Sequence, residues 1–148
     1  MRDSLGLIDT FAERGALVDG ETNKRLVLDA YVALNSGDAA GYFARMADDV
    51  QITYFGSHRF SRTFRGKQDL MKNFVPPLRE GLDDSIKLHV KNVIGEGDQV
   101  VVEAQGEART KDGLDYNNLY CIVLRLANDK IVEIREYMDT DLTQKIFG

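Results

Sequence analysis

The chain has 148 residues, 43% of them hydrophobic, and a formal net charge of −5, which together fit one globular domain with its own core. Its acidic balance argues against a duplex nucleic-acid binder, which needs clustered Lys and Arg, and its apolar runs are too short to cross a bilayer. Since the N-terminus lacks the basic and apolar segments of a signal peptide, we expect a cytoplasmic protein with neither nucleic-acid nor membrane partners.

The N-terminal part of the sequence predicts an extension followed by a strong helix. Residues 1–20 form the extension, in which Ser4–Leu17 has the spacing of a short amphipathic helix, and residues 21–148 form the folded domain. The first helix of this domain is expected to end at Asn35-Ser36-Gly37. Its apolar positions at helical spacing are Leu26, Val27, Ala30, Tyr31 and Leu34.

The next segment predicts two more helices with a hairpin between them. Asp38 offers an N-cap for a short helix that is expected to end at Asp48-Asp49. From Val50 the apolar period changes to two, which predicts a β-hairpin that ends near Phe64. A third helix follows, and Pro76-Pro77 should stop it, because the residue before proline avoids the α region.

The remainder of the chain has the pattern of a sheet. Four strand-like runs are separated by turn sequences, which predicts an antiparallel meander. The runs are Ile86–Ile94, Gln99–Arg109, Tyr116–Leu126 and Ile131–Thr140. With no internal repeat or linker, the sequence predicts a single α+β domain.

The turns also predict which residues share a face of the meander, because the register of a hairpin follows from its loop length. A tight turn at Asn128-Asp129 places Leu126 opposite Ile131 and, further out, Asn118 opposite Asp139. One face then collects Glu103, Gln105, Glu107, Tyr116, Asn118, Tyr120, Arg135, Tyr137 and Asp139. A β-bulge would exchange the two faces beyond it.

The opposite face is nearly free of charge. It holds Val100, Val102, Ala104, Gly106, Ala108, Leu119, Cys121, Val123, Val132, Ile134 and Met138. Because both faces then need cover, we expect helices over one and a second copy of the chain over the other. The sequence therefore predicts a homodimer formed through the sheet.

Several strings in this order of elements carry a resemblance to a known superfamily. Tyr31–Asp38, Ala47–Val50, Tyr116–Tyr120 and Ile131–Asp139 resemble the ketosteroid isomerase-like and SnoaL-like domains of the nuclear transport factor 2-like superfamily. The last hairpin also resembles that of limonene epoxide hydrolase. The resemblance covers roughly Thr22 to Gly148. It implies a cone-shaped, cystatin-like fold, in which a curved antiparallel sheet wraps around N-terminal helices and leaves a small-molecule pocket.

The functional positions of these families transfer only in part. The general base of the steroid isomerases falls on Tyr54 and their carboxylic hydrogen-bond donor falls near Ile122, so that mechanism is not expected here. Of the epoxide hydrolase site, Tyr54 and Asp139 match, whereas Glu103 and Gln105 replace its Arg and its other Asp. Polyketide-cyclase-like members place an Asp base in the corresponding last strand.

The expected site has Asp139 as general base and Tyr54 as its catalytic partner, with no cofactor and no metal. The reaction would be acid–base chemistry of the cyclase, isomerase, dehydratase or hydrolase type on an apolar, oxygen-bearing substrate. The expected ligand-binding residues are Tyr31, Glu103, Gln105, Asn118, Tyr120, Arg135 and Tyr137. Two alternatives stay open. Asp139 is also placed to cap the C-terminal turn Leu142–Phe147, and the domain also fits a non-catalytic binding or assembly module.

Overall fold

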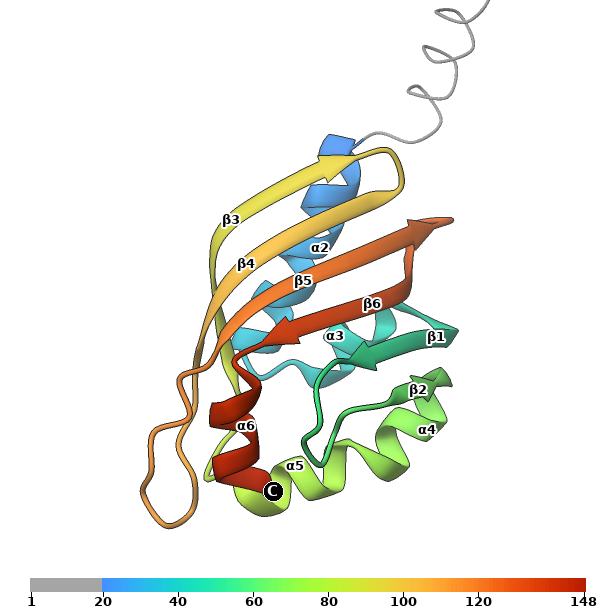
Figure 1. Ribbon diagram of the computed structural model, residues 1–148. Helices are drawn as coiled ribbons and strands as arrows, with labels where there is room; N and C mark the ends of the chain where they lie inside the picture. The colour runs from blue at the N-terminus through green and yellow to red at the C-terminus, as the bar shows by residue number, and fades with distance from the viewer. Residues whose placement is uncertain (1–19) are drawn as a thin grey trace, which may run out of the picture.

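The structure is a computed structural model that describes residues 20–148, so the predicted helix Ser4–Leu17 lies outside the described residues. The helices are α2 (Gly20–Asn35), α3 (Ala39–Ala44), α4 (Gly66–Asn73), α5 (Val75–Gly81) and α6 (Thr140–Phe147). The strands are β1 (Met46–Tyr54), β2 (Thr63–Arg65), β3 (Lys87–Glu96), β4 (Gln99–Glu107), β5 (Leu119–Ala127) and β6 (Lys130–Met138). Figure 1 shows a curved sheet with α2 and α3 behind it and α4, α5 and α6 toward one end.

The first two predicted helices of the folded domain are present, and the second ends earlier than predicted. Helix α2 ends at Asn35, whose side-chain amide donates to the Leu88 carbonyl at 2.8 Å and so ties the helix to β3. The Asp38 carboxylate caps α3 by accepting from the Gly41 amide at 2.8 Å. However, α3 ends at Ala44, and the chain through Asp48 is already strand β1. The prediction that the helix ends at Asp48-Asp49 is wrong, because both side chains point to solvent and do not interrupt the strand.

The two prolines lie at the start of a helix rather than at its end. Helix α4 stops at Asn73, before the prolines, and α5 starts at Val75 and carries Pro76 and Pro77 in its first turn. The prediction that the prolines stop a helix is wrong, because Val75, which precedes Pro76, is itself helical. The first amides of a helix have no partner within it, so proline fits there without loss of a hydrogen bond. The prolines therefore belong to the first turn of α5, and Phe74 lies at the junction of α4 and α5.

The sheet has six strands in the order β2-β1-β6-β5-β4-β3. The predicted meander is confirmed as β3 to β6, and the predicted hairpin is confirmed as β1 with β2. Strand β1 pairs with β6 in parallel, which makes the sheet mixed. The strands curve without closing, so the helices rest against a concave face (Figure 1).

The predicted register is correct at one turn and wrong beyond it. Leu126 pairs with Ile131, and Asn128 and Asp129 both have positive φ angles, of 51° and 59°, as a two-residue hairpin turn requires. The next pair is Arg125 with Glu133, so β6 carries one extra residue, a β-bulge. From there on every residue of β6 faces the side opposite to the predicted one.

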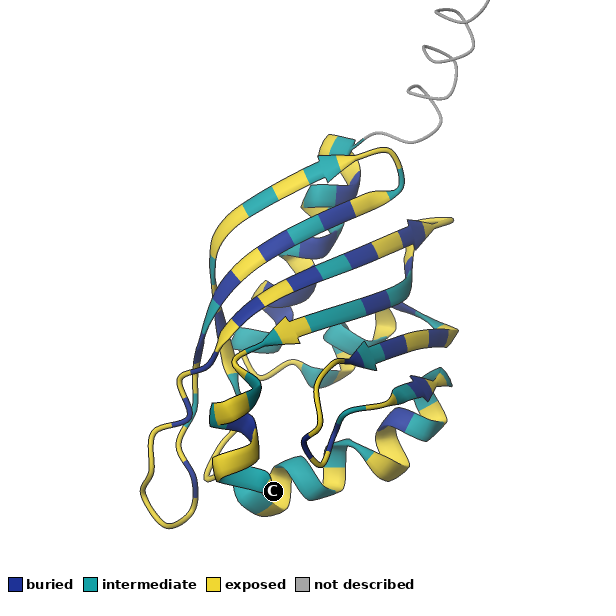
Figure 2. Cartoon of the chain, in the orientation of Figure 1, coloured by how far each residue is buried: buried dark blue, intermediate teal, exposed yellow. Residues whose placement is uncertain are grey.

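Strands β4 and β5 are also shifted by one residue from the predicted register. The connection between Glu107 and Leu119 is longer than a tight hairpin, and Glu103 pairs with Cys121 rather than with Ile122. The concave face of the sheet consequently carries a set of apolar side chains from β4, β5 and β6. Its buried members are Val100, Val102, Ala104, Tyr120, Ile122, Leu124 and Ile134. Figure 2 shows the resulting alternation of buried and exposed residues along the central strands.

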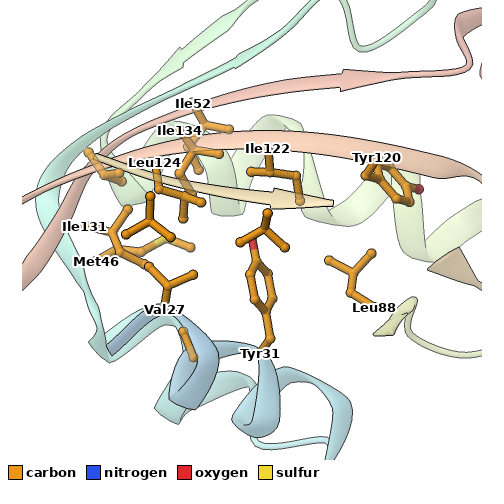
Figure 3. Close-up of a cluster of buried hydrophobic side chains, with 14 of the residues drawn as sticks. Val27, Tyr31, Met46, Ile52, Leu88, Tyr120, Ile122, Leu124, Ile131 and Ile134 are labelled. Carbon is orange, nitrogen blue, oxygen red and sulfur yellow. The ribbon is translucent and has the colours of Figure 1, made fainter. Parts of the chain in front are cut away.

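The apolar face is covered by the chain's own helices. Val27 and Tyr31 of α2 point into the concave face toward Ile122 and Leu124 of β5 (Figure 3). The sequence argument for a homodimer assumed that this face needed a second subunit, and the structure removes that assumption. Leu119 was predicted on the covered apolar face, but it lies on the outer face and is 62% exposed.

Candidate active site

A carboxylate that the sequence analysis did not select, that of Glu136, faces the inside of the cone. It lies on β6 between Ile134 and Met138 on the concave side, beside Ile122 of β5 and Tyr54 of β1. Residues that pair across neighbouring strands share a face, and Ile122 and Tyr54 are both buried. The bulge in β6 is what brings Glu136 to this side.

The environment of Glu136 favours its neutral form. Burial raises the pKa of the Glu136 carboxyl from 4.5 to about 8. Within residues 20–148, no hydrogen-bond donor reaches this carboxyl group and no cation pairs with it. Glu136 is therefore a protonated acid for most of the time at neutral pH, and it loses its proton at slightly alkaline pH.

Four tyrosines are close enough to respond to the charge of Glu136. Burial raises the pKa of Tyr31, Tyr42, Tyr54 and Tyr120, and the nearby carboxylate raises each further. Their phenol groups therefore stay protonated and remain hydrogen-bond donors. The hydroxyls of Tyr31, Tyr42 and Tyr54 have no hydrogen-bond partner within residues 20–148, so they are available to a ligand.

Two small cavities meet at Glu136. The first, of about 60 Å³, is lined by Tyr31, Tyr42 and mostly apolar side chains. The second, of about 30 Å³, is lined by His58, Phe60, Tyr116 and others. Tyr54, Phe74 and Glu136 line both. Such volumes hold a few water molecules, whereas ligand pockets typically have roughly 300 Å³ or more, so a ring-sized ligand requires side chains to move.

Two larger hollows lie on the surface and differ in chemistry. They measure about 350 and 370 Å³ and are open depressions lined mainly by charged and polar side chains. Of the carboxylates that line them, Asp83 is exposed and Glu133 pairs with Arg125. The buried carboxyl between the two inner cavities is therefore the better candidate for chemistry.

The imidazole of His58, in the loop between β1 and β2, forms hydrogen bonds to the backbone through both of its nitrogens. Its Nδ1 accepts from the Phe60 amide at 3.2 Å, which leaves Nε2 to donate to the Phe55 carbonyl at 3.1 Å. These contacts fix the tautomer and fold the loop between β1 and β2 around a buried imidazole. His58 is a structural residue in this arrangement.

Asp139, predicted as the general base, lies outside the cavities. It is exposed, and its Oδ1 accepts from the backbone amides of Asp141 and Leu142 at 3.1 and 3.2 Å. These are the contacts of an N-cap, and Asp139 precedes α6 directly. The geometry supports the alternative that the sequence left open, a cap on the C-terminal helix.

Asn118 is fully buried and fully paired. Its amide donates to the Thr143 hydroxyl at 2.9 Å and to the Asp139 carbonyl at 3.1 Å, and its oxygen accepts from the Asp139 and Leu119 amides. The Tyr116 hydroxyl joins this network through Thr143 at 3.0 Å. Asn118 therefore fastens α6 to the start of β5.

The other predicted ligand-binding residues divide between the two faces. Tyr31 and Tyr120 line the cavities, as does Tyr54, the predicted catalytic partner. Four others lie on the outer face of the sheet, because the register shifts moved them there: Glu103, Gln105, Arg135 and Tyr137. Tyr137, for example, is 45% exposed and stacks on Phe55 with ring centroids 4.5 Å apart.

The sequence held a signal for Glu136. Ile134, Glu136 and Met138 alternate along one strand, so a carboxylate shares a face with two large apolar residues. A charged residue on an otherwise apolar face marks a buried polar group, which is the more informative observation. Within residues 20–148, no group of three or more His, Cys, Asp or Glu side chains is arranged to hold a metal ion.

Comparison with known proteins agrees with this fold. The model of a family described as "SnoaL-like domain" matches residues 27–134. No curated protein matches the sequence. None of the helices of residues 20–148 has the length and hydropathy that a membrane-spanning helix needs.

Three solved structures illustrate the similarity. Bal32a, from a soil-derived mobile gene cassette, superposes with a TM-score of 0.77 at 21% identity, over 87% of this chain and 98% of its own. TerC, co-crystallised with polyporic acid, gives 0.74 at 21%, over 85% and 98%. A protein classed as a SnoaL-like polyketide cyclase from a Jannaschia species gives 0.68 at 20%, over 86% and 92%. At these identities the likeness shows the fold alone.

Proposed function

This chain belongs to the family of SnoaL-like domains, and we propose that it catalyses cofactor-free acid–base chemistry on a small, apolar substrate that bears a carbonyl or hydroxyl oxygen. The proposed proton-transfer group is Glu136. The observation that carries the proposal is a carboxyl group without a partner, between two cavities, with a pKa raised by burial to about 8. Strongly perturbed carboxyls in cavities are typical of catalytic groups.

The chemistry follows from this pKa. A general acid or base works best when its pKa lies near the working pH, and that of Glu136 is within about one unit of neutral. In its ionised form the carboxylate would take a proton from the carbon next to a substrate carbonyl. The negative charge would move to the carbonyl oxygen, where the hydroxyl of Tyr31, Tyr42 or Tyr54 would donate a hydrogen bond. The protonated Glu136 would then return the proton to another carbon of the enolate, which completes an isomerisation. In a cyclisation the enolate carbon would first attack a second carbonyl carbon of the same substrate, and Glu136 would give its proton to the alkoxide oxygen that this attack forms.

Similar proteins support the substrate class. The structure of TerC contains polyporic acid, and the Jannaschia protein is classed as a polyketide cyclase. The polyketide-cyclase-like proteins that the sequence resembles also carry their base on the last strand. On that strand of this chain, Glu136 is the carboxylate that reaches the cavities, whereas Glu133 lies on the outer face and Asp139 caps a helix.

Ligand binding without turnover is the second candidate. The small volume of the cavities favours it, since a proton-transfer enzyme must admit its whole substrate. In that case the phenol groups and the neutral Glu136 would only hydrogen-bond a ligand.

Proton exchange separates the two functions without knowledge of the natural substrate. NMR would follow deuterium exchange at the α-carbon of small ketones in D₂O for the wild type, Glu136→Gln and the control Asp139→Asn. We expect the wild type to accelerate exchange, Glu136→Gln to lose this acceleration by roughly 10²- to 10⁴-fold, and Asp139→Asn to keep it. Equal rates in the wild type and Glu136→Gln would refute catalysis and leave binding as the function.

A further inference from the structure

Phe74 stands between the two cavities. It lies at the junction of α4 and α5, where its amide donates to the Leu70 carbonyl at 3.0 Å and its carbonyl accepts from the Leu78 amide at 3.2 Å. Its ring stacks on Tyr54 with centroids 4.7 Å apart and an angle of 14°, and it meets the rings of Phe60 and Phe64 edge-on. Since Phe74 lines both cavities, removal of its ring would join them.

The first cavity offers polar groups that are free. Tyr31 and Tyr42 contribute hydroxyls that have no partner within residues 20–148, and Tyr54 and Glu136 add a third hydroxyl and the carboxyl group. A ligand that leaves these groups without hydrogen bonds would gain little from the site, because polar groups in such a space need partners. This cavity therefore suits the oxygen-bearing part of a ligand.

Three polar side chains that line the second cavity and not the first, those of His58, Tyr116 and Thr143, are already paired. The hydroxyls of Tyr116 and Thr143 bond each other at 3.0 Å, and both bond the Asn118 amide. Both ring nitrogens of His58 are occupied by the backbone. Apart from Tyr120 and the shared Tyr54 and Glu136, the other lining side chains, such as Phe60 and Met138, are apolar. This cavity therefore suits an apolar group.

We propose that the cone contains two subsites of opposite polarity divided by Phe74, and that its ligand is a small amphipathic molecule. The oxygen-bearing head lies against Glu136 and the free tyrosines, and a short apolar tail enters the second cavity when the Phe74 ring swings aside. Phe74 is then the residue that sets how long a ligand the protein accepts. The placement of the oxygen-bearing head against Glu136 rests on the proposed function, whereas the division of the cone by Phe74 into two subsites does not.

A series of 4-alkylphenols, from phenol to 4-butylphenol, tests the division directly. Isothermal titration calorimetry would measure each affinity for the wild type, Phe74→Ala and the control Met71→Ala, whose side chain is on α4 but exposed. In Phe74→Ala we expect affinity to rise about fourfold for each added methylene that becomes buried. In the wild type and in Met71→Ala the rise should be smaller, because the ring must first be displaced.

Two further variants keep the test decisive. If Phe74→Ala does not fold, Phe74→Leu retains an apolar side chain and should show the same trend with a smaller slope. Glu136→Gln should weaken every phenol by a similar factor and leave the dependence on tail length unchanged. An equal dependence on tail length in folded Phe74 variants and the wild type would overturn the division. Loss of ketone exchange with an intact tail-length effect would instead overturn only the catalytic function.

Discussion

The buried carboxyl of Glu136 makes the stability of the protein depend on pH in a defined direction. Burial raises its pKa from 4.5 to about 8, so between these values the folded state keeps a proton that the unfolded state has lost. The free energy of unfolding should therefore decrease as pH rises through this window. The slope is about 1.4 kcal/mol per pH unit, which amounts to about 5 kcal/mol over the window. Below pH 4.5 and above pH 8 this group contributes no slope.

Glu136→Gln should remove this slope, because an amide does not ionise. The variant should match the wild type near pH 4 and become progressively more stable than it toward pH 8. Other carboxyls titrate as well, so the measured quantity is the difference between variant and wild type at each pH. The chain contains no tryptophan, so urea unfolding is best followed by circular dichroism.

The control for this measurement is Glu133→Gln. Glu133 lies on the same strand but on the outer face, where Arg125 and Arg135 pair with it at 3.2 and 3.1 Å and help to lower its pKa. Its removal should give a small effect of the opposite sign, because a lowered pKa stabilises the folded state above the unfolded-state value. Parallel pH curves for the wild type and Glu136→Gln would refute the argument that the folded protein holds a neutral Glu136.

Three further predictions concern residues outside the cavities. Asp139→Asn should leave stability almost unchanged in thermal unfolding, whereas Asp139→Ala should lower it by about 1 kcal/mol, because Asn caps a helix as well as Asp does; equal losses would contradict the capping role. Asn118→Ala should cost about 1–3 kcal/mol in urea unfolding, since it removes the oxygen that accepts from the Asp139 and Leu119 amides; an unaltered midpoint would contradict it. The homodimer expected from sequence stays a prediction, and its surface would now be the outer face that exposes Leu119 and Tyr137. Light scattering should show a dimer for the wild type and a monomer for Leu119→Lys, and a monomeric wild type would refute it.

The parts of the fold that depend on local chemistry could be predicted from the sequence. The Asp38 cap, the end of α2 and the turn at Asn128-Asp129 each follow from a few neighbouring residues. The β-bulge in β6 could not be predicted in the same way, because the alternation of residues fits either face of a strand equally well. The choice between faces depends on the helices that cover the sheet and on β1, which is distant in sequence and pairs with β6.

The one extra residue in β6 determines which side chains of this strand can belong to the candidate site. Without the bulge, Tyr137 and Asp139 would lie on the inner face of the sheet. With the bulge, Glu136 lies on that face. The tyrosines Tyr31 and Tyr54 were found from sequence because they come from elements that the bulge does not shift. The role proposed for Phe74 could not be predicted, because it depends on a new helix, α5, that starts at Val75 and on packing against Tyr54 and Phe60.

Two polar residues inside the protein, Asn118 and Glu136, differ in their contacts. Every polar atom of the Asn118 side chain is hydrogen-bonded, so this residue stabilises the fold and its removal should weaken it. The Glu136 carboxyl has no hydrogen bond within residues 20–148, so it contributes no such stabilisation and lowers stability wherever the unfolded chain ionises. A purely structural requirement at this position would be met better by an apolar side chain of similar size. The opposite signs expected for Asn118→Ala and Glu136→Gln at pH 8 therefore distinguish a residue that holds the cone together from one that is placed to act on a ligand.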